Sequence, residues 1–424
     1  MSVLEKVCII TLGCKVNKYE SECMATSLIE NGFDVVFDLE FADFYIINTC
    51  AVTAMSEKKS RQYIAKIRKI NPKAKIIVCG CASECNKEQF QKDENIVIFG
   101  TQQKSKIVDY IKNIPFVNID YTKIYEEFEK PFVNSTRAYL KIQDGCNNFC
   151  SYCIIPYLRG RSRSRNYEDI IKEAKELSKT HKEIVLIGID ISDYRINNEL
   201  ALGKVMQGLS DIPARIRISS FEERIISDDF LQILKSMPNF APHFHLSLQS
   251  GDSEILKKMN RKYTREMYIE KCKLIKKYFP NANITTDIIV GFPGETDEQF
   301  ENSVSLAKEV EFGKIHVFPY SSRKGTVASK YEDLSPEIKK KRVQILSNVG
   351  DELSIKYRNK FLGKDFSVIL EDEEDGYITG ITANYIKVYM PISDKYKSGD
   401  LVNIRLKEIY KDGVLSEYVW LRFL

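Results

Sequence analysis

A chain of 424 residues is too long for one ordinary domain, and we expect two or three. Its composition, 43% hydrophobic and 29% charged, is that of a folded globular protein and excludes disorder along the whole length. The 63 basic and 59 acidic residues leave a formal net charge of only +4, so any contact with nucleic acid must come from local basic patches.

The first part of the chain alternates between short apolar runs and helical patterns. The apolar runs predict four strands, at Lys6 to Leu12, Phe44 to Asn48, Lys75 to Cys79 and Ile96 to Phe99. The stretches between them predict helices at Tyr19 to Asn31 and Ala54 to Ile70. Because strands that alternate with helices form mainly parallel sheets, we expect residues 1–115 to be an α/β domain.

The same alternation returns after Arg137. Six runs predict strands, at Ala138 to Gln143, Ile184 to Ile189, Arg215 to Ser219, Phe244 to Gln249, Ile284 to Val290 and Lys314 to Phe318. Helices are predicted at Tyr167 to Lys179, Asp228 to Ser236, Thr264 to Tyr278, Thr296 to Val310 and Pro336 to Lys360. A complete eight-unit barrel needs about 250 residues, so residues 132–360 fit a partial (βα)6 barrel better.

The last 60 residues are rich in Val, Ile and Tyr, with turn signals at 374–376, 398–400 and 411–413. Short strands joined by turns predict a small β-barrel over residues 361–424. This segment carries eight basic and eleven acidic residues, so its net charge is negative. The fold class is thus α/β, with a parallel N-terminal sheet, a partial central barrel and a small C-terminal barrel.

The chain contains eleven cysteines and no visible secretory signal, so we expect a cytoplasmic location. No run of 18 or more apolar residues occurs, so we expect no membrane partner. In a reducing compartment, clustered cysteines bind metal or do redox work more often than they form disulfides.

Three cysteines follow the first strand of the predicted partial barrel. Cys146, Cys150 and Cys153 are spaced C-x3-C-x2-C. Thiolates suit iron–sulfur clusters and zinc, and three close thiolates can hold three irons of a cubane while the fourth iron stays open to a small molecule. Zinc is the alternative, although a zinc site would want a fourth ligand nearby.

A second set of cysteines lies at strand ends of the N-terminal domain. Cys14, Cys50 and Cys81 each stand just past the C-terminal end of a predicted strand. In a parallel sheet those ends lie along one edge, so we expect the three thiols to converge on a shared ligand. The alternative is that each is a small buried apolar residue, and Cys85 is an alternative ligand to Cys81.

The chain resembles the radical S-adenosylmethionine methylthiotransferases along nearly its full length. The segments that carry the resemblance are Gly13-Cys14-Lys15-Val16-Asn17, Asn48-Thr49-Cys50-Ala51-Val52-Thr53, Gly80-Cys81, Asp144-Gly145-Cys146, Tyr157-Leu158-Arg159-Gly160, 246–251 and 287–296. The resemblance implies that Cys14, Cys50 and Cys81 hold an auxiliary [4Fe-4S] cluster. It also implies that a second [4Fe-4S] cluster, at Cys146, Cys150 and Cys153, binds S-adenosyl-L-methionine, and that the C-terminal barrel is of the RNA-binding TRAM type.

The chemistry that this resemblance implies requires both clusters. One S-adenosylmethionine donates a methyl group to sulfur at the auxiliary cluster, and another is cleaved with an electron from an external donor. The resulting radical removes hydrogen from an aromatic carbon, where the methylthio group is inserted. An adenine C2–H bond has no acidic proton, so we expect no side chain to act as catalytic acid or base.

Four residues on the predicted barrel strands are candidates for binding S-adenosylmethionine. Ser247 and Gln249 alternate on one strand and therefore point to the same face. Gly188 would allow close approach of the adenine, and Asp287 is a further inward candidate. The alternative is that each polar residue only makes a hydrogen bond within the protein at the end of the barrel and has no role in binding the cofactor.

The family has three branches, which modify tRNA bearing isopentenyladenosine, tRNA bearing threonylcarbamoyladenosine, or a ribosomal-protein aspartate. Residues 13–17 and 315–321 look most like the threonylcarbamoyladenosine branch. The resemblance thus implies methylthiolation at C2 of N6-threonylcarbamoyladenosine 37 in the anticodon loop of tRNA. That nucleoside carries a carboxylate, and our candidate cations for it are Arg159, Arg161 and Arg323. The alternatives are the other two substrates, or a non-catalytic RNA-binding protein in which the clusters are structural.

Overall fold

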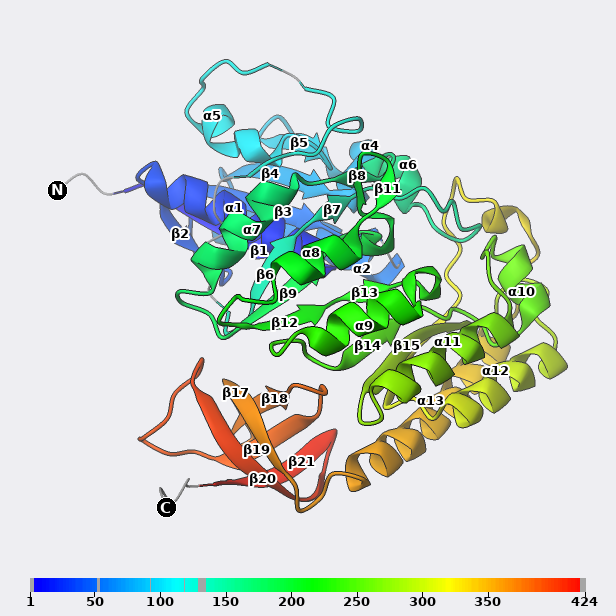
Figure 1. Cartoon of the computed structure of the whole chain (residues 1–424). Coiled ribbons are helices and arrows are strands. Elements are labelled where there is room, and N and C mark those ends of the chain that lie inside the picture. Colours follow the sequence, from blue (N-terminus) through cyan, green and yellow to red (C-terminus); the bar gives the residue numbers. More distant parts are fainter. Residues whose placement is uncertain (1–3, 52–53, 92, 118, 129–134, 420–424) are drawn as a thin grey trace.

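The structure, a computed structural model, describes residues 4–51, 54–91, 93–117, 119–128 and 135–419. Figure 1 shows the chain passing from an N-terminal sheet, through a central layer of strands and helices, to a small barrel that ends near the C-terminus. Among the helices of the described ranges, none has both the length and the apolar character needed to cross a membrane.

The N-terminal sheet has five parallel strands in the order β2-β1-β3-β4-β5. They are β1 (Lys6–Thr11), β2 (Asp34–Val36), β3 (Phe44–Thr49), β4 (Lys75–Gly80) and β5 (Ile96–Gly100). The associated helices are α1 (Lys15–Glu30), α2 (Ala54–Ile70), α3 (Cys81–Cys85), α4 (Lys87–Phe90) and α5 (Ile107–Ile111). Every residue of β3 is buried, as expected for a parallel sheet with helices on both faces.

The central strands form two adjoining sheets of parallel strands, β12-β9-β6 and β13-β14-β15-β16. A bridge between Ile216 and Phe240 joins them into one curved, open barrel. The strands are β6 (Ala138–Lys141), β9 (Glu183–Ile187), β12 (Arg215–Ile218), β13 (Ser220–Phe221), β14 (His243–Leu246), β15 (Asn283–Val290) and β16 (Lys314–Pro319). The expected partial barrel of α/β class is confirmed.

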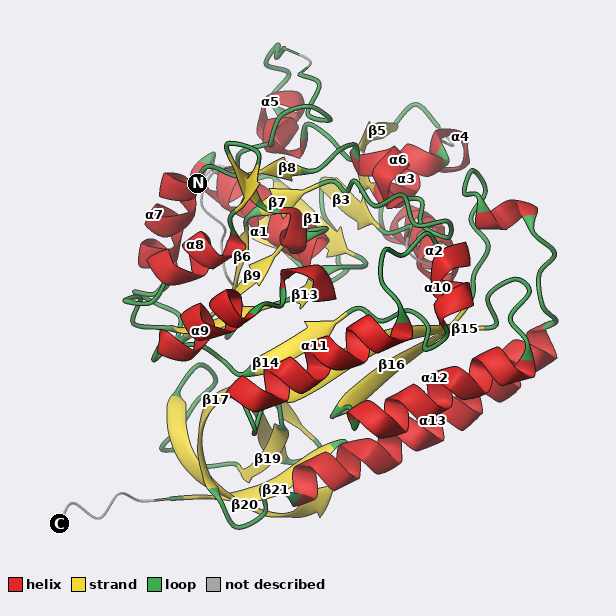
Figure 2. Cartoon of the chain, turned by 45° about the vertical axis from the view of Figure 1, so that its right-hand side comes forward, coloured by secondary structure: helices red, strands yellow, loops and turns green. Residues whose placement is uncertain are grey.

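Helices follow these strands and cover the outer face of the barrel. In Figure 2, α11, α12 and α13 lie along one side of the strands β14, β15 and β16. The helices are α6 (Ile155–Arg159), α7 (Tyr167–Leu177), α8 (Leu202–Gly208), α9 (Asp228–Ser236), α10 (Ser253–Lys258), α11 (Arg265–Tyr278), α12 (Asp297–Val310) and α13 (Pro336–Asn359). Several of these helices begin at side-chain caps, such as Thr264 for α11 and the Thr296–Gln299 capping box for α12.

Short elements complete the connections between the longer ones. The short strands pair as β7 (Gln143–Asp144) with β8 (Arg163–Ser164) and β10 (Arg195–Ile196) with β11 (Glu199–Leu200). Single turns of 3-10 helix are η1 (Lys104–Lys106), η2 (Ile191–Asp193), η3 (Glu223–Ile225) and η4 (Ala328–Lys330). The β7–β8 pair brackets the loop with Cys146, Cys150 and Cys153 and thereby fixes both of its ends.

The C-terminal segment closes into a five-stranded barrel in the order β17-β18-β19-β21-β20, as the sequence predicted. Its strands are β17 (Asp365–Glu374), β18 (Tyr377–Thr382), β19 (Lys387–Pro391), β20 (Leu401–Tyr410) and β21 (Gly413–Tyr418). Its interior is apolar, because Val368, Leu370, Val388, Ile404 and Leu406 are fully buried inside it.

The C-terminal barrel is attached to the central strands by arginines of β12. Arg217 donates hydrogen bonds from Nη1 to the carbonyl of Ala383 (3.0 Å) and from Nη2 to that of Thr382 (3.1 Å). Arg215 donates from Nη2 to the carbonyl of Ser367 (3.1 Å). These bonds hold the loop between β18 and β19 against the edge of the central strands.

Helix α1 lies at the junction between the N-terminal sheet and the central strands. Its residues Val16, Tyr19 and Cys23 pack against Val185 and Ile187 of β9. The two parallel sheets are therefore held face to face across one helix, and the residues at the start of α1 stand between them.

Candidate active site

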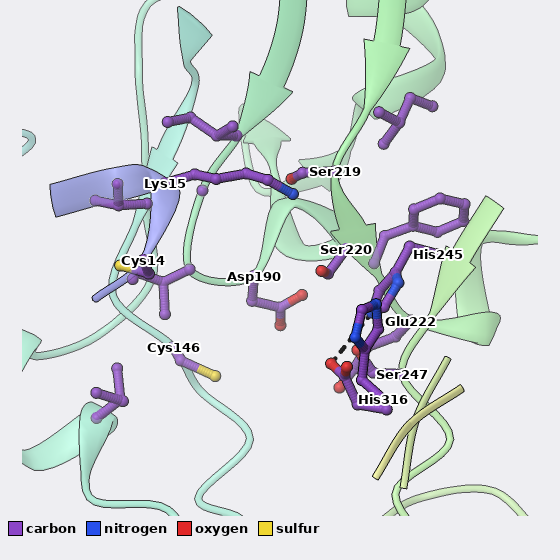
Figure 3. Close-up of a pocket in the computed structure, with 18 of the residues that line it drawn as sticks. Cys14, Lys15, Cys146, Asp190, Ser219, Ser220, Glu222, His245, Ser247 and His316 are labelled. Carbon is purple, nitrogen blue, oxygen red and sulfur yellow. Dashed lines mark hydrogen bonds and ion pairs between the residues drawn. The ribbon is translucent and has the colours of Figure 1, made fainter. Parts of the chain in front are cut away.

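A cavity of about 830 Å³ lies where the N-terminal sheet, the central strands and the C-terminal barrel meet. Its lining includes all six cysteines expected to bind clusters, namely Cys14, Cys50, Cys81, Cys146, Cys150 and Cys153. The volume is near the upper end of the range for small-molecule sites in proteins. Two sets of thiols that are far apart in the sequence thus share one chamber. Figure 3 shows one member of each set, Cys14 and Cys146.

Two glycines bring the N-terminal cysteines together. Gly13 has φ +101°, and a Cβ at this position would lie 2.6 Å from the sulfur of Cys50. Gly80 has φ +96°, and a Cβ there would lie 2.4 Å from the carbonyl oxygen of Thr49. Only glycine adopts these backbone angles without strain and leaves this space, so the strand ends can approach closely enough for their cysteines to face one cavity.

Arg159 lies beside the N-terminal cysteines within a buried network of charges. Its Nε donates to the sulfur of Cys81 (3.4 Å), and its Nη1 donates to Glu20 (2.9 Å) and Asp144 (3.1 Å). Lys141 contacts the same two carboxylates, at 2.8 and 2.7 Å. All four of these charged side chains are almost fully buried.

The two carboxylates of this network would balance the charges of Arg159 and Lys141. Lys104 also pairs with Glu20 and brings a third positive charge. Burial alone would raise the pKa of Glu20, yet the charges of Arg159, Lys104 and Lys141 outweigh burial and hold this pKa well below its usual range. Burial raises the pKa of the Cys14 thiol, and the positive charge of Arg159 opposes that rise. The positive charge of Arg159 thus offsets part of the effect of burial on the Cys14 thiol, whose pKa stays above its usual value.

The loop with Cys146, Cys150 and Cys153 is held by polar contacts from the central strands and from the end of α10. The backbone N–H of Asn148 donates to the sulfur of Cys146 (3.4 Å), and Nη1 of Arg261 donates to that of Cys150 (3.3 Å). Nδ2 of Asn260 donates to the carbonyls of Asn148 (3.1 Å) and Phe149 (3.0 Å).

The chemistry of the donors suits iron–sulfur clusters. Each set offers three thiols and lines the cavity, and thiolates are the usual ligands of iron–sulfur cores. A structural zinc site wants four protein ligands close together, and within the described ranges no three cysteines have all their sulfurs within 4.8 Å of one another.

The four residues expected to bind S-adenosylmethionine all line the cavity. A Cβ at Gly188 would lie 2.7 Å from a methyl carbon of Ile191, so this position has no room for a side chain. Gln249 has φ +70°, and its backbone N–H donates to the carbonyl of Asp287 (2.9 Å). Ser247 faces the same space from the segment after β14 (Figure 3).

Two acidic side chains that the sequence did not single out also line the cavity. Asp190 and Glu222 both accept hydrogen bonds from Nδ2 of Asn148, at 3.1 and 2.9 Å. Burial and the nearby charge of Glu222 raise the pKa of Asp190 to about 6. Arg261 lies 2.8 Å from the Glu222 carboxylate, so an anion and a cation stand together next to Cys150.

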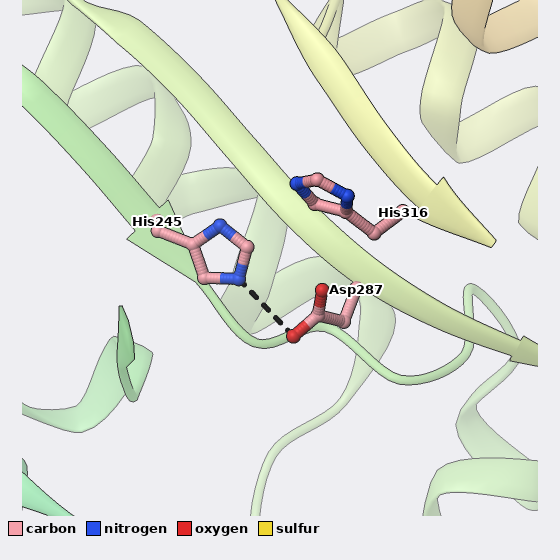
Figure 4. A group of neighbouring side chains, drawn as sticks. All are labelled: His245, Asp287 and His316. Atoms are coloured by element: carbon pink, nitrogen blue, oxygen red, sulfur yellow. Dashed lines mark hydrogen bonds and ion pairs between the residues drawn. The ribbon is translucent and has the colours of Figure 1, made fainter. Parts of the chain in front are cut away.

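Three of the four histidines of the chain line this cavity, and the sequence analysis did not identify them. Nε2 of His245 lies 3.1 Å from the Asp287 carboxylate, and the nearest ligand atoms of His245, Asp287 and His316 are all within 4.8 Å of one another (Figure 4). The third histidine, His243, is buried, and burial lowers its pKa well below the usual value. The sequence signal was the alternation His243-Phe244-His245 at the start of the strand that was predicted from Phe244. Alternate residues of a strand point to one face.

Two further residues reach the cavity from the N-terminal sheet and from the C-terminal barrel. Lys15 is the first residue of α1, and its side chain extends into the cavity toward the side that carries Ser219 (Figure 3). Tyr385 lies between β18 and β19, and its ring stacks on His243 with centroids 4.1 Å apart and planes 2° from parallel. Tyr385 has φ +63°, an unusual angle for a non-glycine residue, which suits a side chain held in a functional position.

The three arginines proposed to bind the substrate have different surroundings. Arg159 lines the cavity, but Glu20, Asp144 and other groups occupy its donors. Arg161 stacks on the ring of Phe149 (4.4 Å), and Arg323 pairs with Glu57 (3.3 Å). Neither Arg161 nor Arg323 belongs to the lining of the cavity, and neither does Cys85. A role of Arg161 and Arg323 in binding the substrate therefore stays a prediction.

Two family models match the sequence. The Radical SAM superfamily matches residues 140–307, and the uncharacterized protein family UPF0004 matches residues 6–100. The chain is 39% identical over 403 residues to the threonylcarbamoyladenosine tRNA methylthiotransferase MtaB of Bacillus subtilis (strain 168), covering 89% of this chain and 88% of that protein.

Other relatives are similar over almost the whole chain. The MtaB protein of Thermotoga maritima is 36% identical, with 97% of both chains covered. The tRNA-2-methylthio-N(6)-dimethylallyladenosine synthase of Bacillus cytotoxicus is 37% identical, with 95% of this chain and 84% of that protein covered. Among solved structures, the radical S-adenosylmethionine methyltransferase TsrM from Kitasatospora setae matches with a TM-score of 0.56 at 14% identity over 77% of each chain, which shows a shared fold.

Proposed function

This chain belongs to the methylthiotransferases of the radical S-adenosylmethionine superfamily, and on that premise we propose that it inserts a methylthio group at C2 of N6-threonylcarbamoyladenosine 37 in tRNA. The observation that supports this proposal most strongly is the meeting of two three-cysteine sets at one cavity. A single cluster would serve to cleave S-adenosylmethionine, whereas insertion of sulfur needs a second one facing the same space.

Enzymes of this family use S-adenosyl-L-methionine and two [4Fe-4S] clusters, and the thiol-only donor sets of the cavity fit such clusters. We assign the cluster that binds S-adenosylmethionine to Cys146, Cys150 and Cys153, and the auxiliary cluster to Cys14, Cys50 and Cys81. When bound, these groups supply the radical that removes hydrogen from C2 and the sulfur that replaces it, with electrons from an external donor.

The residues around Cys146, Cys150 and Cys153 suit the ends of S-adenosylmethionine. The carboxylates of Asp190 and Glu222 would accept hydrogen bonds from its ammonium group, and Arg261 would bind its carboxylate. Gly188 would let the adenine approach the backbone, while Ser247, Gln249 and Asp287 offer polar groups to the ribose. This arrangement would direct the reactive end of the cofactor into the shared cavity.

We propose that each of three segments contributes a distinct part of the site. Residues 1–115 provide the auxiliary cluster, residues 132–360 provide the cofactor site, and residues 361–424 provide Tyr385 and a surface for the anticodon loop. The attachment of the C-terminal barrel through Arg217 supports this division, because it presents Tyr385 next to His243.

The nearest competing substrate is isopentenyladenosine 37, since a dimethylallyladenosine synthase is 37% identical to this chain. Nucleoside mass spectrometry of tRNA from a strain that lacks the gene separates the two. We expect the methylthio form of threonylcarbamoyladenosine to disappear and to return with the wild-type gene but not with Cys146→Ala. If methylthio-isopentenyladenosine disappears instead, the proposed substrate is wrong.

A further inference from the structure

One of the cations that line the cavity makes no ion pair within the residues that the structure describes. The lining contains five lysines and arginines: Lys15, Arg137, Arg159, Arg217 and Arg261. The four arginines are paired with carboxylates, namely Arg137 with Glu371 (2.7 Å), Arg159 with Glu20 (2.9 Å), Arg217 with Glu183 (2.8 Å) and Arg261 with Glu222 (2.8 Å). Within the described part of the chain, the ammonium of Lys15 makes no ion pair and no side-chain hydrogen bond.

The position of Lys15 adds to its positive potential. It is the first residue of the 16-residue helix α1, whose first turn contains no acidic residue. The free backbone N–H groups and the dipole at a helix N-terminus favour an anion at the same place. Its side chain extends from this point into the cavity (Figure 3). The start of α1 therefore offers both a flexible charge and a favourable local field to a ligand anion.

The acidic residues of the lining come from another part of the chain than Lys15. Asp190, Glu222 and Asp287 all belong to the central strands and the segments that follow them. Each of these carboxylates already has a partner, namely Arg224 for Asp190 (2.7 Å), Arg261 for Glu222 (2.8 Å) and His245 for Asp287 (3.1 Å). Lys15 therefore remains to meet a negatively charged group of the substrate, and such a contact gives selectivity for a ligand that carries a carboxylate.

The chemistry of the proposed substrate selects the same location. In adenine, C2 and the carbon that bears N6 flank the same ring nitrogen, so both lie on one edge of the base. C2 must meet the auxiliary cluster, to which we assign Cys14 as a ligand. The substituent on N6 must then lie next to that cluster, and Lys15 directly follows Cys14 in the chain.

We propose that Lys15 binds the carboxylate of the threonylcarbamoyl group and so selects this nucleoside over one whose N6 substituent is uncharged. This inference rests on the proposed function. A lysine suits the task, because its ammonium is a compact charge on a flexible stem and can follow a flexible side chain of the substrate.

The test compares two anticodon stem-loop RNAs, one with threonylcarbamoyladenosine 37 and one with the carboxamide analogue, which has the same shape but no charge. Dissociation constants and kcat/KM are measured anaerobically with the reconstituted holoenzyme. We expect the wild type to prefer the acid by roughly 10- to 100-fold, the range for one hydrogen bond to a charged group. Lys15→Met should lose this preference, and Lys15→Arg should retain most of it.

Lys18→Met is the matched control, because Lys18 lies on the same helix, over the ring of Tyr139 (5.4 Å), outside the lining of the cavity. It should discriminate as the wild type does. If Lys15→Met keeps the full preference for the acid, the inference is overturned while the proposed function stands. Loss of S-adenosylmethionine cleavage without RNA in this variant would assign Lys15 to the cofactor and also overturn it. If the wild type does not modify the acid at all, it is the proposed function that fails.

Discussion

Glu20→Gln should destabilise the junction between the N-terminal sheet and the central strands. The Glu20 carboxylate is only 2% exposed and contacts Lys104, Lys141 and Arg159. Its pKa is held well below the usual range because the three cations outweigh the effect of burial, so it is ionised at neutral pH. A neutral glutamine keeps the shape of the side chain but leaves three buried cations without the carboxylate that they share.

The expected loss of free energy of unfolding follows from the number of cations that pair with Glu20. Removing one partner of a buried ion pair costs about 3–5 kcal/mol. Since three cations share Glu20, we expect the upper end, about 5 kcal/mol. For a cooperative unit of 150–250 residues, each kcal/mol lowers Tm by about 2–4 °C, so we expect Tm to fall by about 10–20 °C.

The assay is thermal unfolding of the holoenzyme under anaerobic conditions, followed by circular dichroism. The control is Glu30→Gln, which removes an exposed carboxylate from the same helix and should change the free energy of unfolding by less than about 0.5 kcal/mol. A Glu20→Gln variant that unfolds at the same temperature as this control would refute the reasoning.

The same network predicts how stability depends on pH. A carboxylate whose pKa is lower in the folded chain stabilises the fold above its unfolded pKa of about 4.3, and this contribution is lost as the pH falls toward the folded value. The difference between wild type and Glu20→Gln should therefore be complete above about pH 5 and shrink below about pH 4. A difference that stays constant down to low pH would contradict an ionised Glu20.

Two further predictions concern the clusters and the C-terminal barrel. Cys50→Ala and Cys150→Ala should each lower the iron content of the reconstituted protein from about eight to about four per chain. Only Cys150→Ala should abolish cleavage of S-adenosylmethionine without RNA. Loss of all iron in either variant would contradict two separate clusters. Tyr385→Ala should weaken binding of the modified stem-loop by roughly 2- to 10-fold, the range for one aromatic stacking contact. Cleavage of S-adenosylmethionine without RNA should stay unchanged. Equal loss of RNA binding and of this cleavage would show that Tyr385 only supports the fold.

The strand ends that carry the cysteines could be predicted because each follows a short, strongly apolar run. Such a run is buried on both faces of a parallel sheet, so its end is marked in the sequence by the first polar or small residues. This holds for β1, β3 and β4, whose ends the sequence placed within one residue. The convergence of their cysteines then follows from the geometry of parallel strands.

The start of α1 could not be predicted, and with it the roles of Lys15 and Glu20 were missed. The sequence indicated a helix from Tyr19, whereas α1 begins at Lys15. Its buried residues include Asn17, Glu20, Ser21 and Glu22 between the apolar ones, so polar positions interrupt the apolar pattern of the helix. These polar residues are buried because they meet charges from other elements, such as Lys104 and Lys141, which lie far away in the sequence.

The substrate side of the cavity was equally hidden, because it depends on contacts between domains. The sequence indicated Arg159 as a cation for the substrate, yet donors of Arg159 are occupied by Glu20, which lies 139 positions earlier in the chain. Tyr385 reaches the cavity only because Arg217 holds the loop between β18 and β19. No periodic pattern in the sequence encodes such a contact.

The charged residues of the cavity offer different partners to the proposed pair of ligands. S-adenosylmethionine carries positive charge on its sulfonium and ammonium groups, and Asp190 and Glu222 stand beside the loop with Cys146, Cys150 and Cys153. The proposed nucleoside carries a negative charge, and Lys15 stands in the lining next to Cys14. On the proposed assignment each ligand thus meets its own partners in one chamber, which would bring the base between the two clusters rather than into the cofactor site. An uncharged N6 substituent would lose its contact to Lys15 and with it this orientation.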